Sequence, residues 1–453
     1  RGYRLTQEGV NRVREMYKAK GLTQEKLATL AHTTVDTVKR LLGTKRSENG
    51  VERWVIENVV RVLGLKPTDI VDPKIWNPHH TQYPSEFKSL IEEKISNFCG
   101  RQFVFDAFEQ FLNSHLNGYF TLIGDAGMGK SAIASKYVAD CGAICYFNVL
   151  AERRNRPELF LKSVRQQIIQ RYQLKEAEQD NLSTLLAKVS EQLKTGDRLV
   201  IVVDALDEVE QEPGGNLLDL PKTLPKQVYF FLTRRPYILR NKRLFIDPGV
   251  PIRELDLTHQ DYCQFSQQDI QEYIRLFVAA DSDYQNTLRQ WIQNQNVSIE
   301  QFIQQVAEKS ENNFMYIRYL LPAIANGNYN DLDLKDLPQG LQEYYQTHWV
   351  RMGMEERQPL MVMVLFILVE IGTPIPCGMI AEISDTDEAD VGEILERWRE
   401  YLIVQEIESE TCWTLYHASF LQFLSQKRDL KSSRKLFKEV NQRIVDYYQS
   451  FAL

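Results

Sequence analysis

The sequence has few cysteines for its length, no long apolar run and no repeated segment. Its 6 cysteines are spread over 453 residues without a C-x-x-C pair, so a disulfide framework and a cysteine-based zinc site are both disfavoured. The longest unbroken apolar run, residues 360–369, is about half the length of a membrane-spanning helix. No signal peptide or low-complexity tract is visible. These absences predict a cytoplasmic protein whose cysteines are small buried hydrophobic residues.

Charge is unevenly distributed along the chain. The formal net charge is −7, which argues against nucleic-acid binding by the chain as a whole. Residues 1–75, however, contain 15 Lys and Arg against 9 Asp and Glu, so this segment is about +6 and the remainder about −13. The length predicts about two to four domains. Because the sequence begins at Arg1 and not at methionine, we expect it to be a piece of a longer protein.

The apolar pattern changes several times along the chain. An N-terminal part with helical spacing is followed by a proline-containing linker, and then by short apolar strands that alternate with helices. That alternation predicts a parallel sheet covered on both faces. Helices alone follow, and a last part adds a hairpin (402–407 and 413–416) to helices, as in a winged-helix domain. The predicted fold class is multidomain α/β. Its expected segments are 1–75 (all-helical domain), 76–96 (linker), 97–257 (nucleotide-binding domain), 258–350 (helical lid domain), 351–430 (winged-helix domain) and 431–453 (start of a following helix).

A phosphate-binding loop is the strongest motif. Residues 124–131 read GDAGMGKS, which matches G-x-x-x-x-G-K-[ST] between an apolar strand (119–123) and a helix. The glycines let successive backbone N–H groups and the helix N-terminus face a phosphate chain. Lys130 can reach the β- and γ-phosphate oxygens, and the Ser131 hydroxyl can bind Mg²⁺. We therefore predict ATP or ADP with Mg²⁺ as ligands. The expected contacts in this loop are Gly124, Gly127, Gly129, Lys130, Ser131 and Ala132.

Acidic and basic residues at the ends of two later strands complete the predicted site. The apolar run 199–203 leads directly into Asp204, which is placed to bind the metal ion. Asp207 or Glu208 would then orient or deprotonate the attacking water. Arg235 follows the next strand, where an arginine can sense the γ-phosphate. A solvated acidic turn and a surface charge pair are the alternative interpretations of these two segments.

Together these residues resemble the NACHT branch of the STAND ATPases, signalling switches related to AAA+ proteins. The small residue after Asp204 and the two further acids are typical of that branch. Residues 98–101 are similar to the family element that lines the adenine pocket, which implies that Gly100 and Arg101 contact the nucleotide. Arg235 directly precedes a proline and matches the sensing residue of the family.

Two more segments extend the resemblance over about residues 95–430. Residues 311–316 are similar to the helical-domain motif Gly-Asn-Phe-Leu-Tyr, with Asn312 where glycine is usual. Residues 416–424 resemble the winged-helix segment whose histidine touches the β-phosphate of ADP, which implies a nucleotide contact for His417. The resemblance implies a closed ADP-bound form, exchange for ATP on sensing a trigger, oligomer assembly and slow Mg²⁺-dependent hydrolysis that resets the switch. The sensor is expected in a missing part of the chain or on another protein.

The basic N-terminal segment resembles a lambda-repressor-like helix-turn-helix over residues 21–43. Thr23 and Thr34 are expected to cap its two helices, and the apolar face of the second helix packs inward. The opposite face would meet bases and phosphates, although Asp36 would face phosphates with the wrong charge. The residues expected to contact double-stranded DNA are Thr34, Val35, Asp36, Lys39, Arg40, Lys45 and Arg46.

Two functions remain open from the sequence. In the first, the chain is an ATP-driven switch that regulates transcription or defence signalling through a DNA-binding N-terminal domain. In the second, it is a nucleotide-regulated assembly scaffold with little turnover, whose N-terminal domain is a protein–protein adaptor. Salt-dependent DNA binding would separate the two.

Overall fold

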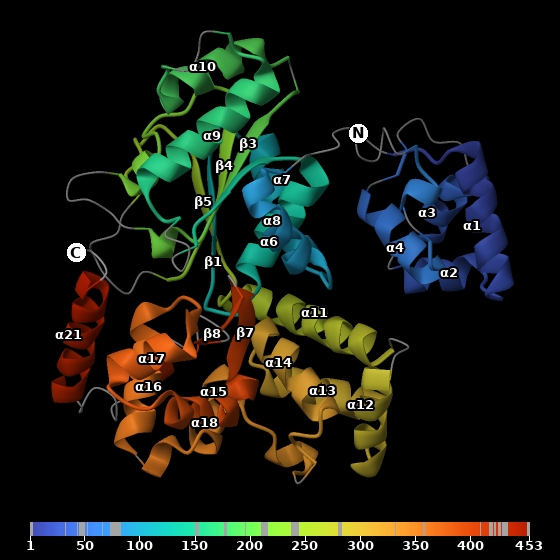
Figure 1. Ribbon diagram of the computed structural model, residues 1–453. Coiled ribbons are helices and arrows are strands. Elements are labelled where there is room, and N and C mark those ends of the chain that lie inside the picture. Colours follow the sequence, from blue (N-terminus) through green and yellow to red (C-terminus); the bar gives the residue numbers. More distant parts are fainter. Residues whose placement is uncertain are drawn as a thin grey trace. The chain divides into compact units, whose positions relative to one another are not determined.

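The computed structural model describes most of the chain in two compact units, residues 1–86 with 139–142, and residues 87–138 with 143–453. Each unit is treated by itself below (Figure 1). The model describes residues 3–450 except 32, 43, 45–49, 52, 66, 73–82, 150–153, 176–178, 195, 210–215, 237–243, 280–282, 331, 357, 408, 416–419, 421–422, 425–426 and 428–433.

The first unit is a small helical bundle. It contains α1 (Gln7–Ala19), α2 (Gln24–Leu30), α3 (Val35–Leu41), α4 (Arg53–Leu63) and the short η1 (Pro67–Asp69). The Thr23 and Thr34 hydroxyls accept hydrogen bonds from Lys26 N and Thr37 N, so the predicted N-caps are confirmed. The buried residues of the bundle are apolar and come from all four long helices. Among them are Val13, Leu27, Val38, Leu41, Ile56, Val59 and Leu63.

The second unit is built on a five-stranded parallel sheet in the order β2-β3-β4-β1-β5. Because β3, β4 and β1 are parallel and adjacent in this order, their carboxyl ends lie side by side at one edge of the sheet. Valine, isoleucine and aromatic side chains fill the inner strands, which are buried along their whole length. The predicted parallel sheet is therefore confirmed. The strands are β1 (Gly118–Ile123), β2 (Ile144–Phe147), β3 (Leu199–Asp204), β4 (Val228–Arg234) and β5 (Ile252–Asp256).

Helices connect these strands and cover the sheet (Figure 1). Before β1 come α6 (Ser85–Ile95) and α7 (Gln102–Ser114), and α8 (Lys130–Cys141) follows it. Between β2 and β3 lie α9 (Pro157–Tyr172) and α10 (Leu182–Gln192). Two 3-10 turns, η3 (Leu206–Glu208) and η4 (Leu217–Asp219), follow β3.

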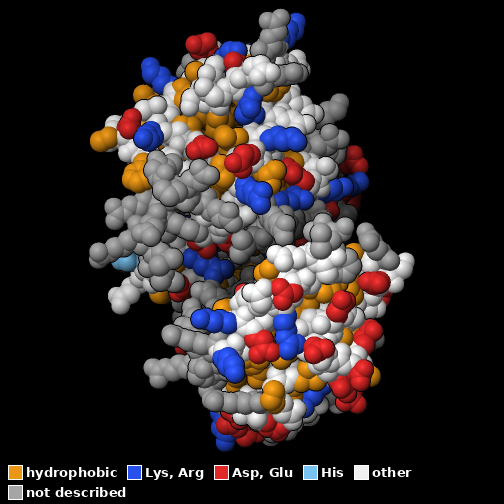
Figure 2. All heavy atoms as spheres, turned by 60° about the vertical axis from the view of Figure 1, so that its left-hand side comes forward, with side chains coloured by type: hydrophobic (Ala, Val, Ile, Leu, Met, Phe, Trp, Pro, Cys, Tyr) orange, Lys and Arg blue, Asp and Glu red, His pale blue; other side chains and the backbone are white. Residues whose placement is uncertain are grey.

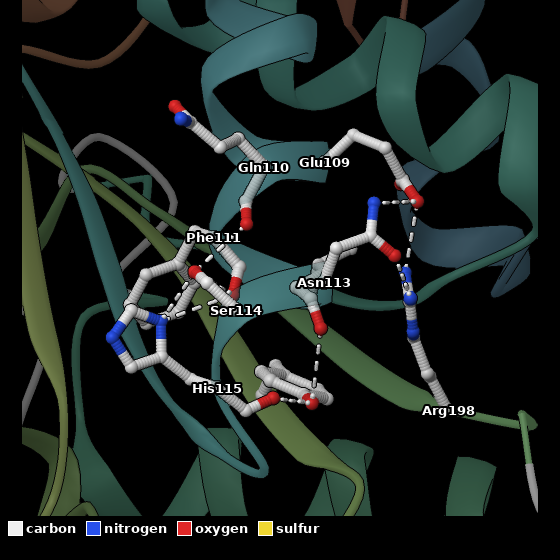
Figure 3. Close-up of polar contacts among 9 residues, drawn as sticks. Glu109, Gln110, Phe111, Asn113, Ser114, His115 and Arg198 are labelled. Atoms are coloured by element: carbon white, nitrogen blue, oxygen red, sulfur yellow. Dashed lines mark hydrogen bonds and ion pairs between the residues drawn. The ribbon is translucent and has the colours of Figure 1, made fainter.

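Polar contacts at the C-terminal end of α7 fix this helix to the sheet (Figure 3). Arg198, just before β3, donates to Glu109 Oε1 at 2.9 Å and to Asn113 Oδ1 at 2.6 Å. The Tyr229 hydroxyl donates to the His115 carbonyl at 2.6 Å. The partners come from separate segments, so these contacts hold α7, and with it the segment that precedes it, in a fixed place against the strands.

The rest of the second unit is helical with one small antiparallel sheet of order β6-β8-β7. The predicted hairpin is present as β7 and β8, paired from Leu402↔Leu415 to Ile407↔Glu410. Its second strand begins at Glu410, three residues earlier than predicted. The elements are α11 (Gln260–Ala279), α12 (Asp283–Asn294), α13 (Ile299–Lys309), α14 (Phe314–Ala325), η5 (Leu334–Asp336), α15 (Gly340–Arg351), η6 (Met354–Glu356), α16 (Pro359–Ile371), β6 (Ile375–Pro376), α17 (Cys377–Ser384), α18 (Glu388–Arg397), η7 (Arg399–Tyr401), β7 (Leu402–Ile407), β8 (Glu410–Leu415) and α21 (Arg434–Ser450).

One hydrophobic core runs through this whole helical part, from α11 to α21. His348 illustrates the continuity, since its ring lies 4.2 Å from that of Tyr344 and 4.7 Å from that of Tyr401, measured between centroids. Acidic and basic side chains are interspersed on the face shown in Figure 2. Within the described ranges, no helix combines the length and the apolar character needed to cross a bilayer.

Candidate functional site

The predicted phosphate-binding loop connects β1 to α8, in the strand–loop–helix order that its motif requires. Gly127 and Gly129 have φ of 84° and 88°, a region that residues with a side chain rarely adopt. A Cβ atom on Gly127 would also lie 2.2 Å from Asn313 Oδ1. At Gly124 the limit is packing, because a Cβ atom there would approach Leu257 to 3.3 Å. Each of the three positions therefore has a local reason to be glycine: a positive φ at Gly127 and Gly129, a close contact with Asn313 at Gly127, and close packing at Gly124.

Lys130 begins α8 and turns its ammonium group back over the loop. Its Nζ donates to the Gly124 carbonyl at 2.7 Å and to the Asp125 carbonyl at 2.9 Å. Burial lowers the pKa of Lys130, while the nearby carboxylates of Asp207 and Asp204 raise it. A partly desolvated ammonium group held by two carbonyls is a strong site for an anion.

Asp204 lies at the end of β3, next to the start of α8. Its side chain is buried, and burial raises the pKa of its carboxyl, whereas hydrogen bonds with Ser131 and Thr233 lower it. The Thr233 hydroxyl donates to Asp204 Oδ1 at 2.5 Å and accepts from Ala205 N at 3.0 Å. The structure therefore brings together Ser131 from the loop and Asp204 from β3, as the sequence analysis required.

This pair of oxygen donors fits Mg²⁺. The ion takes few protein ligands, usually one or two carboxylate or hydroxyl oxygens, and completes its shell with water and phosphate oxygens. Among the described residues, no three His, Cys, Asp or Glu side chains lie close enough together to form a metal site. The described residues therefore contain no metal site made only of such side chains. A divalent cation would also offset the cost of the buried Asp204 carboxylate.

Asp207 and Arg235 form an ion pair beside the loop. Arg235 Nε lies 3.2 Å from Asp207 Oδ2, and the Arg235 backbone N–H donates to Asp207 Oδ1 at 2.9 Å. Both carboxylate oxygens of Asp207 are thus engaged by the same arginine. Glu208 is the next residue of the same turn and, like Asp207 and Arg235, lines the cavity described next.

A cavity of about 650 Å³ extends from the phosphate-binding loop toward the helical part. Lys130 and Ser131 line it, and so do aromatic and polar side chains from α6, α11, α14 and the segment before α7. A cavity that combines a lysine ammonium group and a hydroxyl with aromatic side chains suits a nucleotide. The second group of residues, called the aromatic end below, comprises Glu93, Ser96, Asn97, Phe98, Tyr273, Phe314, Arg318 and Tyr319.

Arg101 lines this cavity, although its main contacts are with the protein, and Gly100 is not among the described residues that line it. Arg101 is 2% exposed, and its guanidinium donates to the Met128 carbonyl at 2.8 Å and to Ser266 Oγ at 2.7 Å. Burial lowers the pKa of Arg101 to about 10. The Arg101 backbone N–H, made available by the turn at Gly100 (φ 67°), donates to Asp269 Oδ2. The predicted nucleotide contact is therefore also a link between the loop and α11.

The start of α14 holds the other side of the loop. Asn313 Nδ2 donates to the Ala126 carbonyl at 2.8 Å, and Met315 N donates to the Gly127 carbonyl at 3.2 Å. Asn312, where glycine is usual in the related motif, has φ of 62°. Asparagine tolerates this conformation better than most residues, so the turn forms without glycine.

Sequence reasoning did not find most of the aromatic end of the cavity. Glu93, Tyr273 and Tyr319 reach it from three different helices, and each position is typical of an ordinary amphipathic helix. A single sequence carries no signal that would separate them from core residues. Only the packing of α6, α11 and α14 brings them together.

The residues predicted to contact DNA lie in the first unit. Asp36, Lys39 and Arg40 are exposed on α3, and Thr34 is exposed at its N-cap. Val35, predicted to point outward, is partly buried and packs against the core of the bundle. Lys45 and Arg46 lie outside the described residues, as does His417, the nucleotide contact predicted in the second unit.

Comparison with known proteins agrees with this geometry. Residues 119–281 match the family model of the NACHT domain, and no curated protein sequence matches the chain significantly.

Solved structures with a likeness to the chain are all at low sequence identity, and three of them serve as examples. A STAND protein with a tetratricopeptide repeat sensor from Pyrococcus horikoshii has 16% identity and a TM-score of 0.29, over 79% of this chain and 46% of that one. A chain of the Drosophila ORC bound to DNA has 12% sequence identity and a TM-score of 0.30, over 76% of this chain and 100% of that one. The RuvB branch migration motor of Thermotoga maritima has 12% sequence identity and a TM-score of 0.26, over 73% of this chain and 96% of that one. Scores this low add no functional argument, so the domain match is the finding that counts. Residues 119–281 are therefore similar to a NACHT domain, and the phosphate-binding loop lies within this stretch.

Proposed function

We propose that the chain is an ATP/ADP-binding signal-transduction NTPase that switches between a closed ADP-bound form and an open, oligomeric ATP-bound form. The observation that supports this best is the cavity that is lined by Lys130 and Ser131 together with aromatic side chains. Hydrolysis is slow and resets the switch. The trigger is recognised by a sensor that is separate from the parts described above.

In this proposal the loop residues bind the phosphates. Lys130 exchanges its two carbonyl partners for phosphate oxygens, which carry full charge and bind an ammonium group more strongly. Ser131 and Asp204 hold Mg²⁺, which would neutralise phosphate charge when bound. Gly127 and Gly129 keep the backbone close enough for its N–H groups to face the ligand.

Asp207 and Arg235 supply the distinction between ADP and ATP. Arg235 is paired with Asp207, and a γ-phosphate is a stronger competitor for the guanidinium than a single carboxylate. The two nucleotides would therefore favour different positions of Arg235, and a ligand shifts a two-state equilibrium by its difference in affinity for the two states. Since the Arg235 backbone N–H holds Asp207 Oδ1 independently of the guanidinium, Glu208 is the better candidate to orient the attacking water.

Mass spectrometry of nucleotide released from the purified chain tests the binding site. We expect ADP from the wild-type protein and none from Lys130→Ala, because the loop then lacks its only lysine. Lys136→Ala is the matched control, since Lys136 lies on the same helix and is not among the residues that line the cavity. ADP retained by Lys130→Ala would show that the phosphate-binding loop is wrongly assigned.

We further propose that the N-terminal unit is a helix-turn-helix domain that binds double-stranded DNA. The support is the net charge of residues 1–75, about +6, together with the exposure of Lys39 and Arg40 on α3. Binding of the full chain to duplex DNA should weaken as salt rises, and Lys39→Ala with Arg40→Ala should reduce the salt slope by about 2. Lys18→Ala, an exposed lysine on α1, is the control for loss of charge.

The alternative is an assembly scaffold with little turnover, in which the N-terminal unit is a protein–protein adaptor. The exposed Asp36 at the start of α3 favours this alternative, because a carboxylate there would repel phosphates. Affinity for DNA that does not change with salt, or that is unaffected by the Lys39 and Arg40 substitutions, would favour the adaptor.

A further inference from the structure

Two buried asparagines in the connection between β2 and α9 hold the acidic turn that follows β3. Asn148 and Asn155 are 4% and 2% exposed. Asn148 Nδ2 donates to the Asp204 carbonyl at 2.6 Å, and Asn155 Nδ2 donates to the Glu208 carbonyl at 3.1 Å. The two amides therefore hold the first and the last residue of the acidic turn, defined here as residues 204–208.

This turn needs outside support because its backbone is strained. Ala205 has φ of 55°, in the left-handed region that costs a residue with a Cβ atom about 1–2 kcal/mol. Within the turn, Glu208 N donates to the Ala205 carbonyl three residues earlier, at 3.0 Å. Backbone strain of this kind persists only where the surroundings fix the conformation. The asparagine amides, together with Thr233 and Arg235, are those surroundings.

The segment that carries Asn155 is itself anchored to the sheet. The Tyr146 hydroxyl, from β2, donates to the Arg154 carbonyl at 3.1 Å. Arg154 N donates to the Val149 carbonyl at 3.0 Å. The residue before Asn155 is therefore bonded to β2, and the Asn155 side chain is bonded to the turn after β3. These two contacts fix the position of Asn155 relative to the sheet.

Neither asparagine lines the cavity proposed to bind the nucleotide. Among the described residues that line the cavity are Asp207 and Glu208, but not Asn148 or Asn155. The Asn148 Oδ1 atom is buried and has no hydrogen-bond partner among the residues that the structure describes, which carries a desolvation cost that an apolar side chain of similar size would avoid. An amide retained at that cost is explained by its donor, which the Asp204 carbonyl accepts.

We propose that Asn155, together with Asn148, positions the acidic turn for hydrolysis without taking part in nucleotide retention. This proposal rests on the function proposed above. The amide of Asn155 fixes the Glu208 backbone and so the direction from which the Glu208 carboxylate approaches the attacking water. Displacement of a catalytic group by about 1 Å reduces turnover by about a hundredfold, whereas the loop that binds the phosphates is held by other residues.

Asn155→Asp is the sharpest test because it keeps the size of the side chain and removes the amide donor. We expect kcat for ATP hydrolysis to fall by about ten- to a hundredfold, with KM and the dissociation rate of a fluorescent ADP analogue within about twofold of the wild type. The matched control is Asn181→Asp. Asn181 caps α10 by accepting from Thr184 N at 2.9 Å, and a carboxylate can accept the same bond.

A pH profile separates positioning from general damage to the fold. The ionised carboxyl introduced by Asn155→Asp cannot donate to the Glu208 carbonyl, but its protonated form can. Burial raises the pKa of such a carboxyl, so the ratio of wild-type to variant turnover should shrink between about pH 8 and about pH 6. If Asn155→Asp does not yield folded protein, Asn155→Ser removes the amide without introducing a buried charge, and the same loss of kcat is expected without recovery at low pH.

The results distinguish this proposal from the proposed function. If the wild-type chain neither binds nor hydrolyses ATP, the proposed function itself fails. If the wild type hydrolyses ATP and the folded Asn155 variants turn over at the wild-type rate, the positioning role is refuted while the ATPase stands. It is also refuted if ADP dissociation accelerates in proportion to the loss of kcat, since Asn155 would then act on nucleotide retention. A wild-type chain that retains nucleotide without turnover likewise overturns the positioning role.

Discussion

Replacement of Arg101 by methionine should destabilise the second unit by a large and pH-dependent amount. The guanidinium donates hydrogen bonds to the Met128 carbonyl and to Ser266, and it lies 4.7 Å from the ring centroid of Phe314. Methionine keeps most of the apolar packing but removes both charge-assisted hydrogen bonds. The expected loss in the free energy of unfolding at neutral pH is about 3–5 kcal/mol.

The pH dependence comes from Asp269, whose carboxylate lies beside Arg101. Burial raises the pKa of Asp269, and Arg101 opposes that rise, so the pKa will rise further when Arg101 is removed. A carboxyl whose pKa is higher in the folded than in the unfolded state lowers the free energy of unfolding as the pH rises from its unfolded-state pKa to its folded-state pKa, and it has no such effect at acid pH, where it is protonated in both states. The loss of stability in Arg101→Met should therefore be smaller at acid pH and should grow as pH rises through the raised pKa of Asp269.

Urea unfolding of the full chain at several pH values measures both effects. Asp269→Asn combined with Arg101→Met is the control, because it removes the partly buried charge that has lost its guanidinium neighbour and should make the loss independent of pH. A loss below about 1 kcal/mol, or one that does not change between acid and neutral pH, would refute this account of Arg101.

Two further substitutions test local features of the fold. Gly127→Ala should cost more stability and nucleotide affinity than Gly129→Ala: both positions have positive φ, which costs about 1–2 kcal/mol, but only at Gly127 would the Cβ atom meet Asn313, at 2.2 Å. Equal unfolding midpoints for the two variants would argue against that close contact. Burial lowers the pKa of His348 to about 3, so the fold should lose about 2 kcal/mol between pH 6.5 and pH 5 as the unfolded state takes up a proton. His348→Gln should flatten this slope in urea unfolding, and an unchanged slope would assign it to other groups.

The sequence predicted the parallel sheet and the local context of its motifs well. A strand followed by a glycine-rich loop and a helix is a contiguous arrangement, so residues 118–141 carry their own structural explanation. The same holds for the carboxylate at the end of β3 and for the hairpin of β7 and β8. The helix caps at Thr23 and Thr34 also depend on a few neighbouring residues only.

Contacts between distant segments could not be predicted in the same way. The sequence suggested Asp207 as a catalytic group and Arg235 as a sensor, but it did not indicate that they pair with each other. Their contact depends on β3 lying next to β4, and the order of strands in space does not follow their order in the chain. Arg101 is a similar case, since its partners on α11 are about 165 residues away.

The sequence by itself therefore determined the local form of the phosphate-binding loop, a glycine-rich segment that lies between a strand and a helix and ends in Lys130 and Ser131, because all of these residues stand in one short segment. Only the tertiary structure decided how the site is enclosed and held. The aromatic end of the cavity, the Asp207–Arg235 pair and the contacts of the two asparagines with the acidic turn each bring together groups from separate segments of the chain. Such contacts depend on packing and strand order, because each residue alone is compatible with an ordinary core or surface position.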